Sequence, residues 1–311
     1  MRISITRTLG TLAATAVCLT AGATAASAAG PATDSFAAAF SYSLLVPNAD
    51  TPGANDWSCR PSSARPRPVV LVHGTWENRY DNWASLSPRL KAAGYCVYAL
   101  NYGDDANSAL GLLPSLKGTS DIGQSAKELA TFVDAVRTST GVAKVDIVGH
   151  SQGGLMARQY LKFEGGASKV RKLVTLGATH HGTTLSGIGS LGNTLNLLGV
   201  AQPFLGQAAI QQVVGSSFLT TLNAGGDTVP GIDYTVIATK YDEVTTPYAS
   251  TFLTAGPGAT VQNITVQDGC PIDFGDHLSM SFGPRISAIV RRALTPGSVA
   301  LVPCLPKPPV L

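Results

Sequence analysis

Short apolar-rich runs recur along the chain, and polar residues or glycine separate them. They cover residues 68–72, 95–100, 145–148, 170–176, 234–238 and 263–266. Each run has the length of an ordinary strand, and apolar side chains at successive positions face both sides of a sheet. Strands of this kind occur in parallel sheets whose two faces are covered by helices. The pattern therefore predicts six buried strands.

Apolar residues at helical spacing lie between these runs. One set contains Trp83, Leu86 and Leu90 and stops at Gly94. A longer set begins after Asp121, a residue type that caps helices, and ends at a glycine; its apolar positions are Ile122, Ala126, Leu129, Val133 and Val136. A third set follows the run at 145–148 and comprises Leu155, Met156, Tyr160 and Leu161. Each set predicts a helix that packs one face on the sheet.

The two ends of the chain are less regular. Residues 29–67 contain many Ala, Pro, Ser and Gly, and we expect loop there. Residues 283–294 have the pattern of a closing helix, and the Pro-rich stretch from 303 to 311 is expected to be extended. Strands that alternate with helices predict an α/β fold with a mostly parallel sheet. Ligands of such sheets gather at the carboxyl ends of the strands.

The stretch 183–222 departs from this alternation. It contains no charged side chain, is rich in Leu, Gly and Ala, and lies between two predicted strands. Forty residues are too many for a simple crossover. We interpret the segment as an apolar cap, or lid, over a ligand-binding cleft. The alternative is a buried pair of crossover helices.

The first 28 residues have the pattern of a secretory signal. Arg2 and Arg7 precede an apolar stretch, and Ala26-Ser27-Ala28 supplies small residues for cleavage after Ala28. The apolar stretch is short and rich in Ala and Thr, which favours a cleaved signal over a membrane anchor. We therefore expect a secreted protein in which residues 29–311 form a single domain.

Charge and cysteine content narrow the possible functions further. The net charge of +3 falls to +1 when the signal is removed with its two arginines, so binding to nucleic acid is not expected. Four cysteines remain outside the signal, and an even number in an exported chain predicts disulfides. Four cysteines allow three pairings, of which the local one, Cys59–Cys96 with Cys270–Cys304, would tie each end of the domain to its body. No Cys-x-x-Cys spacing occurs, which disfavours a metal site.

The sequence Gly-His-Ser-Gln-Gly occupies residues 149–153, between a predicted strand and a predicted helix. A Gly-x-Ser-x-Gly motif in that context is typical of a nucleophile elbow, a tight turn that presents its serine for reaction. The motif alone is weak, because the chain contains 33 glycines and chance matches are frequent. The order of the flanking elements favours Ser151 as a nucleophile over a serine in an ordinary glycine-rich turn.

A serine hydroxyl becomes reactive when a base takes its proton, and a buried carboxylate usually orients that base. The expected chain order of serine, acid and histidine favours His277 as the base. Asp242 follows the strand predicted at 234–238 and is the preferred acid, with its neighbour Glu243 as the rival. Four other acids lie in loops or at strand starts and are less well placed: Asp227, Asp233, Asp268 and Asp273.

The remaining candidates have supporting roles. Asp276 is expected to be a solvated loop charge, and the ring of His150 is expected to point away from the Ser151 hydroxyl. An oxyanion hole needs two backbone N–H donors. One is expected from Gln152, directly after the nucleophile, and the other from Thr75 in the loop after the first strand. The Thr75 hydroxyl is a possible third donor.

Taken together, four motifs resemble the class 2 lipases secreted by actinomycete bacteria and, more distantly, yeast lipase B of the α/β-hydrolase superfamily. They are V-H-G-T, G-H-S-Q-G-G, A-T-K-Y-D-E-V-T-T-P and D-H-L. The resemblance runs from about Cys59 to Cys304. It implies an α/β-hydrolase fold, a triad of Ser151, Asp242 and His277, and an oxyanion hole of Thr75 and Gln152. It supports Asp242 over Glu243 and is compatible with the local disulfide pairing.

The resemblance implies a carboxylic ester hydrolase that needs no metal or organic cofactor. The expected substrate is a lipid or another ester, met at an oil–water interface, and the protein is expected to be a monomer without a stable membrane anchor. A polyester depolymerase or an acyltransferase could use the same triad. A non-catalytic binding module on the same fold is a further alternative, although such modules usually lack a triad member.

Overall fold

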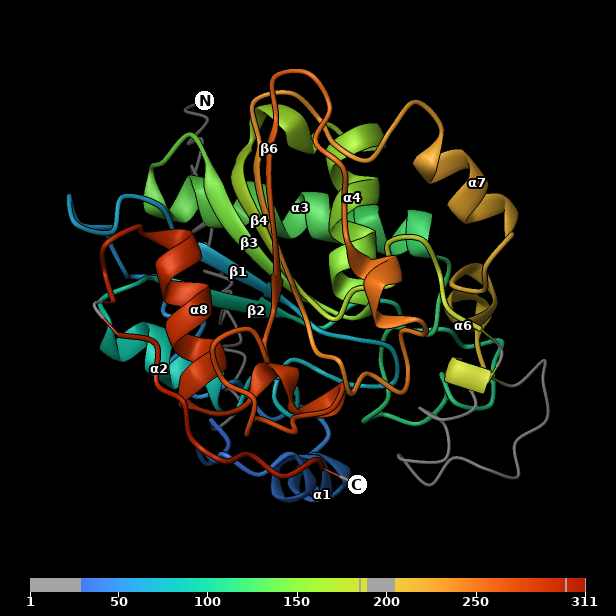
Figure 1. Ribbon diagram of the computed structural model, residues 1–311, viewed down its shortest axis with the longest axis horizontal. Helices are drawn as coiled ribbons and strands as arrows, with labels where there is room; N and C mark the ends of the chain where they lie inside the picture. The colour runs from blue at the N-terminus through green and yellow to red at the C-terminus, as the bar shows by residue number, and fades with distance from the viewer. Residues whose placement is uncertain (1–28, 185, 189–204, 300, 311) are drawn as a thin grey trace, which may run out of the picture.

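The computed structural model describes residues 29–184, 186–188, 205–299 and 301–310 of the 311-residue chain (Figure 1). The predicted signal at 1–28 lies outside these residues. The elements in chain order are α1 (Phe36–Leu45), β1 (Val69–Val72), α2 (Leu86–Ala92), β2 (Val97–Leu100), α3 (Ile122–Thr140), β3 (Val145–His150), α4 (Gln152–Phe163), η1 (Gly166–Ser168), β4 (Val170–Leu176), α6 (Gln207–Gln211), α7 (Ser217–Asn223), β5 (Asp233–Ala238), η2 (Tyr248–Thr251), β6 (Thr260–Thr265), η3 (Leu278–Ser281) and α8 (Pro284–Leu294).

Six strands form one sheet in the order β2-β1-β3-β4-β5-β6, and every neighbouring pair is parallel. Strands β1, β2 and β3 are buried along their whole length, although β2 lies at one edge of the sheet. The predicted parallel α/β sheet is therefore confirmed. β6 is mostly exposed, as an edge strand with one open side can be, and it begins at Thr260, ahead of the apolar residues that predicted it.

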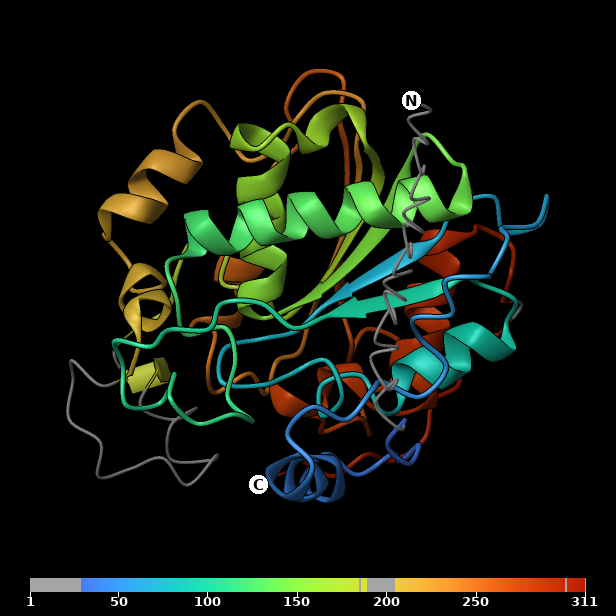
Figure 2. The same ribbon diagram turned by 180° about the vertical axis from the view of Figure 1, so that it is seen from behind.

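Helices cover both faces of the sheet. Apolar residues of α3 and α4 pack on one face, and those of α2 and α8 pack on the other. Figure 2 shows α3 in front of the strands and α8 behind them. The caps of α3 match the sequence prediction: the Asp121 side chain accepts from the Gln124 N–H, and Gly141 ends the helix in the left-handed conformation. Within the described residues, no helix is long and apolar enough to cross a bilayer.

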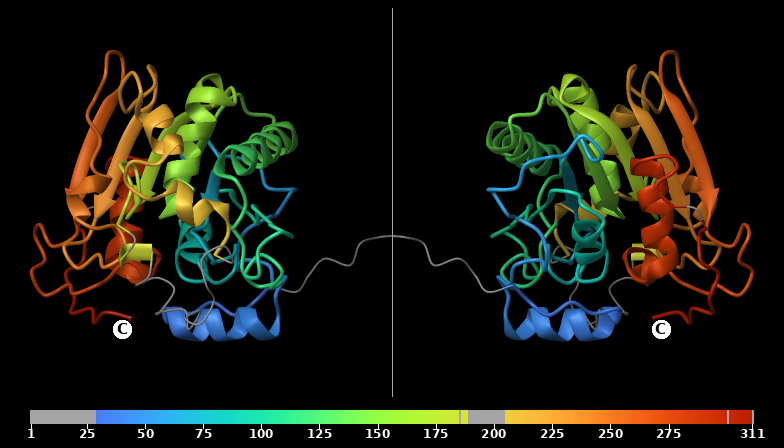
Figure 3. Two further views of the ribbon diagram at one scale, coloured as in Figure 1. Left: turned by 90° about the vertical axis from the view of Figure 1, so that its right-hand side faces the viewer. Right: turned by 90° about the vertical axis from the view of Figure 1, so that its left-hand side faces the viewer.

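The prediction of loop throughout 29–67 is wrong, because this stretch contains α1. The Ser35 side chain caps the helix by accepting from the Ala38 N–H, and Phe36 and Ala39 are buried on one side of it. Phe36 packs edge-on against Phe282, with 5.8 Å between ring centroids. Figure 3 shows α1 in blue at the lower end of the molecule. Its apolar side thus covers loops at the carboxyl ends of the strands.

Part of the predicted cap, 183–222, lies outside the described residues, namely 185 and 189–204. In the described part, Leu219 and Leu222 of α7 are buried in the same apolar core as α3 and α4. Helix α6 packs beside α3 and buries Ala208 and Ala209. Residues 205–222 thus pack on the helices that cover the sheet, and the choice between a lid and a pair of crossover helices stays a prediction.

The structure contains the disulfides Cys59–Cys96 and Cys270–Cys304, the local pairing considered from sequence. The second disulfide ties down the C-terminal tail. There Lys307 forms a parallel bridge with Asp273, and its ammonium donates to the Ser279 carbonyl at 2.8 Å. The tail thereby supports the segment 273–282, which contains His277.

Candidate active site

Ser151 occupies a strained turn between β3 and α4. Its φ is +52° and its ψ is −127°, a backbone conformation that non-glycine residues rarely adopt. The neighbouring glycines make this turn possible. A Cβ on Gly153 would lie 2.2 Å from the Val72 carbonyl oxygen, and one on Gly149 would lie 2.6 Å from the Gly154 nitrogen. The prediction that the motif joins a buried strand to a helix is confirmed.

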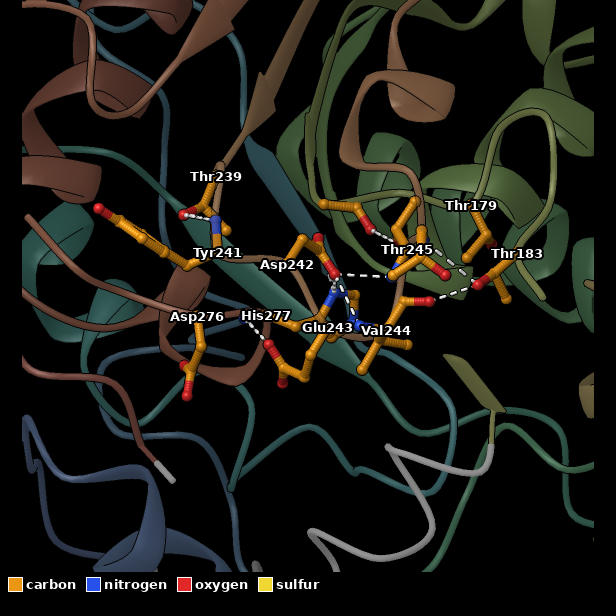
Figure 4. Close-up of polar contacts among 12 residues, drawn as sticks. Thr179, Thr183, Thr239, Tyr241, Asp242, Glu243, Val244, Thr245, Asp276 and His277 are labelled. Carbon is orange, nitrogen blue, oxygen red and sulfur yellow. Dashed lines mark hydrogen bonds and ion pairs between the residues drawn. The ribbon is translucent and has the colours of Figure 1, made fainter. Parts of the chain in front are cut away.

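His277 and Asp242 form a fully buried pair at the carboxyl edge of the sheet (Figure 4). His277 Nδ1 lies 2.9 Å from Asp242 Oδ1 and 3.0 Å from Oδ2, so the ring N–H donates to the carboxylate. Burial alone would lower the pKa of His277, but the charge and hydrogen bond of Asp242 outweigh it and raise this pKa to about 9. Its other ring nitrogen, Nε2, is buried and has no hydrogen-bond partner among the described residues.

The Asp242 carboxylate is held by the turn that follows it. Asp242 Oδ1 accepts backbone N–H groups from Val244 at 3.0 Å and from Thr245 at 2.6 Å, and Figure 4 shows both bonds. These two donors fix the orientation of the carboxylate toward His277. The rival acid, Glu243, instead accepts from the backbone N–H of His277 at 3.3 Å and does not contact the ring nitrogens. The geometry thus favours Asp242 as the partner of the imidazole.

Ser151 and the Asp242–His277 pair meet at the end of β4. The Ser151 N–H donates to the Leu176 carbonyl at 2.9 Å. Gly177 follows, and a Cβ placed on it would lie 3.0 Å from Asp242 Oδ2 and 3.2 Å from His277 Nδ1. Leu176 therefore bonds the serine, and the next residue, Gly177, lies against the Asp242–His277 pair. All three predicted triad residues thus meet at the carboxyl edge of the sheet.

The predicted oxyanion donors lie on both sides of the turn. Neither the Thr75 nor the Gln152 backbone N–H donates a hydrogen bond to another described residue. The Thr75 hydroxyl, however, is not a free donor as considered from sequence. It donates to Gln152 Oε1 at 2.8 Å and accepts from Gln212 Nε2 at 2.9 Å. Gln212 follows α6 and lies within the predicted cap segment, so that segment is hydrogen-bonded directly to the oxyanion loop.

The other histidines that follow strands differ from His277 in their surroundings. His73 stacks on Tyr102 with 4.2 Å between ring centroids, and burial lowers its pKa to about 4. Burial also lowers the pKa of His180, well below its usual value. His181 donates to the Ser250 carbonyl at 2.8 Å and pairs with Asp227 at 3.0 Å. Neither nitrogen of His181 is therefore available for proton transfer in this arrangement.

Asp276 is not the solvated loop charge that we expected. It is 3% exposed, and its carboxylate accepts from the Ser279 N–H at 3.0 Å and from the Val310 N–H at 2.6 Å. The C-terminal tail folds over this carboxylate and removes it from water. Asp276 thus joins the tail to the segment that contains His277.

Sequence reasoning missed a second buried pair beneath the turn, formed by Glu77 and His150. Glu77 Oε2 lies 2.9 Å from His150 Nδ1, and His150 Nε2 lies 3.1 Å from the His277 carbonyl oxygen. Glu77 lies three residues after Gly74 in an irregular loop, where no periodic pattern marks it. Within the described ranges, no three His, Cys, Asp or Glu side chains form a group that could hold a metal ion.

Comparisons with solved structures support the fold. Aspergillus fumigatus lipase B aligns with a TM-score of 0.62 and 20% identity, over 79% of this chain and 55% of that one. The mature form of Bacillus licheniformis lipase BlEst2 aligns with a TM-score of 0.53 and 20% identity, over 76% of this chain and 94% of that one. At this identity the likeness speaks for the fold alone. Together with the parallel sheet it confirms the predicted α/β-hydrolase fold.

Two curated relatives share sequence with part of the chain. Triacylglycerol lipases from Pseudarthrobacter phenanthrenivorans and Burkholderia plantarii are each 31% identical over 121 residues, or 37% of this chain. The matched stretch spans about a third of their length, 34% and 30% respectively. The family model for class 2 lipases matches residues 66–274, more than half of the chain. The chain therefore belongs to the class 2 lipase family.

Proposed function

We propose that this protein is a secreted serine hydrolase that cleaves carboxylic esters, chiefly acylglycerols. Family membership and the two relatives named as triacylglycerol lipases support this substrate class. The observation that carries the proposal is the state of His277. Its Nδ1 is bonded to a buried carboxylate, its Nε2 has no partner among the described residues, and it lies beside the strained turn of Ser151. A general base for a serine hydroxyl needs this arrangement.

In the proposed reaction, the Ser151 hydroxyl oxygen attacks the ester carbonyl carbon while His277 Nε2 takes the hydroxyl proton. The resulting oxyanion accepts the N–H groups of Thr75 and Gln152. The bond to the leaving alcohol then breaks, and His277 returns the proton to that alcohol. Water attacks the acyl-enzyme by the same route and releases the acid. Asp242 keeps the imidazole oriented and stabilises its charged form.

The chain organisation follows from the same proposal. Residues 1–28 are a signal peptide that is removed on export, and residues 29–311 form a single catalytic domain that acts as a monomer. The two disulfides fit an oxidising compartment. N-terminal sequencing of protein recovered from the medium would show Ala29 as the first residue. Recovery of the intact N-terminus in a membrane fraction would contradict this part of the proposal.

The catalytic part is tested with protein lacking residues 1–28, on p-nitrophenyl esters from acetate to palmitate and on emulsified triolein. Ser151→Ala is expected to lower kcat on the order of 10⁵-fold. Ser87→Ala, which also removes a buried serine hydroxyl but on α2, is the matched control and keeps full activity. Full activity in Ser151→Ala would rule out the mechanism. Hydrolysis of short esters but not of triolein would assign an esterase rather than a lipase.

A further inference from the structure

Beneath the Ser151 turn, Glu77 and His150 form a pair as deeply buried as Asp242–His277. Their side chains are 1% and 0% exposed, and 2.9 Å separates Glu77 Oε2 from His150 Nδ1. The mechanism above gives this pair no role. Burying a polar pair costs free energy of desolvation. The contacts that the pair makes show which segments it holds together.

The pair contacts three segments that the proposed mechanism uses. Glu77 Oε2 accepts the backbone N–H of Gly74 at 3.1 Å, directly before the oxyanion donor Thr75. His150 immediately precedes Ser151 in the chain. His150 Nε2 lies 3.1 Å from the backbone carbonyl oxygen of His277. One pair of side chains therefore joins the oxyanion loop, the nucleophile turn and the histidine segment.

The His150 ring is held at both of its nitrogens. Nδ1 lies within hydrogen-bond distance of the Glu77 carboxylate, and Nε2 within that of the His277 carbonyl oxygen. The Asn82 amide nitrogen lies 2.9 Å from His150 Nδ1, and it also donates to Glu77 Oε1 at 2.8 Å and to Ser281 Oγ at 3.3 Å. Both side chains of the pair are therefore fixed at more than one point.

We propose that Glu77 and His150 are a positioning pair, which holds Thr75, Ser151 and His277 at the spacing that the reaction requires. This inference rests on the proposed function. The side chains act through backbone groups and through the residues next to them in sequence. Displacement by about 1 Å of groups that must align with a substrate costs on the order of 100-fold in rate. Substrate binding remote from the reacting atoms is not affected.

The kinetic test uses Glu77→Gln, which preserves shape but removes the charge. We expect kcat per active site to fall on the order of 100-fold, with KM within about twofold of the parent. Active sites are counted by fluorophosphonate labelling, so that unfolded protein does not contribute to the loss. Asp81→Asn is the matched control. Asp81 is equally buried on the same loop, but it bonds Asn78 and Ser43 instead of the three reactive segments.

A second measurement needs no ester substrate. Crystal structures of the parent and of Glu77→Gln are expected to show the backbone at Gly74, Ser151 and His277 displaced by about 1 Å in the variant. His150→Gln repeats both tests if Glu77→Gln does not fold. If the parent cleaves no ester, the proposed function fails, and these structures still test the pair. A folded Glu77→Gln with an unmoved backbone at the three segments, or with the parent kcat, would overturn the inference.

Discussion

Two histidine–aspartate pairs lie near the same edge of the sheet, and they differ in what the second ring nitrogen does. In the pair of His277 with Asp242, Nδ1 donates to the carboxylate and Nε2 has no partner among the described residues. In the pair of His181 with Asp227, Nε2 meets the carboxylate and Nδ1 donates to the Ser250 carbonyl. The His181 side chain is also 36% exposed, whereas that of His277 is fully buried.

The difference teaches how to separate a candidate base from a structural histidine. A carboxylate partner is common to both pairs and raises the pKa of both rings. Of the two pairs, only that of His277 and Asp242 has a ring nitrogen without a partner among the described residues. The pair of His150 with Glu77 belongs with the structural class by this criterion, because both of its nitrogens are bonded.

The test with the largest expected effect replaces the aspartate of each pair by asparagine. Asp242→Asn is expected to lower kcat by about 10⁴-fold, because the amide no longer favours the productive tautomer of His277. Asp227→Asn makes the same chemical change in the other pair, and we expect it to leave kcat within about twofold. Both are measured on a soluble p-nitrophenyl ester. Comparable losses in the two variants would show that the distinction between the pairs is wrong.

The pH dependence provides the next test. His277 must be neutral to accept the Ser151 proton, and its pKa in the resting protein is about 9. We therefore expect kcat/KM to rise about tenfold per pH unit between pH 6 and 8 and to level off near pH 9. Without the carboxylate of Asp242, burial lowers this pKa, so the residual activity of Asp242→Asn should level off at a lower pH. A parent profile that is flat above pH 7 would contradict the raised pKa.

The same shift has a consequence for stability. The folded-state pKa of His277 lies above its ordinary value of about 6.5. Its contribution to the free energy of unfolding is therefore fully present below pH 6.5 and is lost as pH rises through about 9. The difference in Tm between the parent and Asp242→Asn should accordingly be larger at pH 6 than at pH 10.

The test with the smallest expected effect adds one methyl group, at Gly177 or at Gly141. Gly177 has a φ of +54°, and a Cβ there would lie 3.0 Å from Asp242 Oδ2 and 3.2 Å from His277 Nδ1. Gly141 has a similar φ of +73°, with nothing within 4 Å of the added atom. Alanine at either position should cost about 1 kcal/mol in the free energy of unfolding. Only Gly177→Ala should also lower kcat, by roughly tenfold, since it displaces the pair.

Much of this arrangement could be predicted from local patterns. Buried strands such as β1 are uniformly apolar, and the glycines at 149, 153 and 154 signal a turn that tolerates no larger residue. The position of Asp242 after one strand, and of His277 later in the chain, was enough to select them as partners. The edge strand β6 was located only by its C-terminal residues, because its exposed positions carry no apolar signal.

Contacts between loops that are distant in the sequence could not be predicted from such local patterns. The burial of Asp276 depends on Val310, and the pairing of Glu77 with His150 spans 73 residues. The Thr75 hydroxyl is occupied by Gln212, 137 residues later. Helix α1 was overlooked for a different reason: composition outweighed the cap at Ser35 and the spacing of the buried residues Phe36, Ala39 and Ser43.

The C-terminal tail also determines when, during synthesis, the candidate active site can be completed. A ribosome completes the sheet and the Ser151 turn well before it reaches Cys304, Lys307 and Val310, which hold the segment around His277. A chain interrupted at residue 300 would thus already contain the proposed nucleophile, Ser151, while the segment around His277 lacked its support. The arrangement around His277 would be complete only after the tail is translated and the Cys270–Cys304 disulfide has formed. Chains that end before the tail are therefore expected to be inactive.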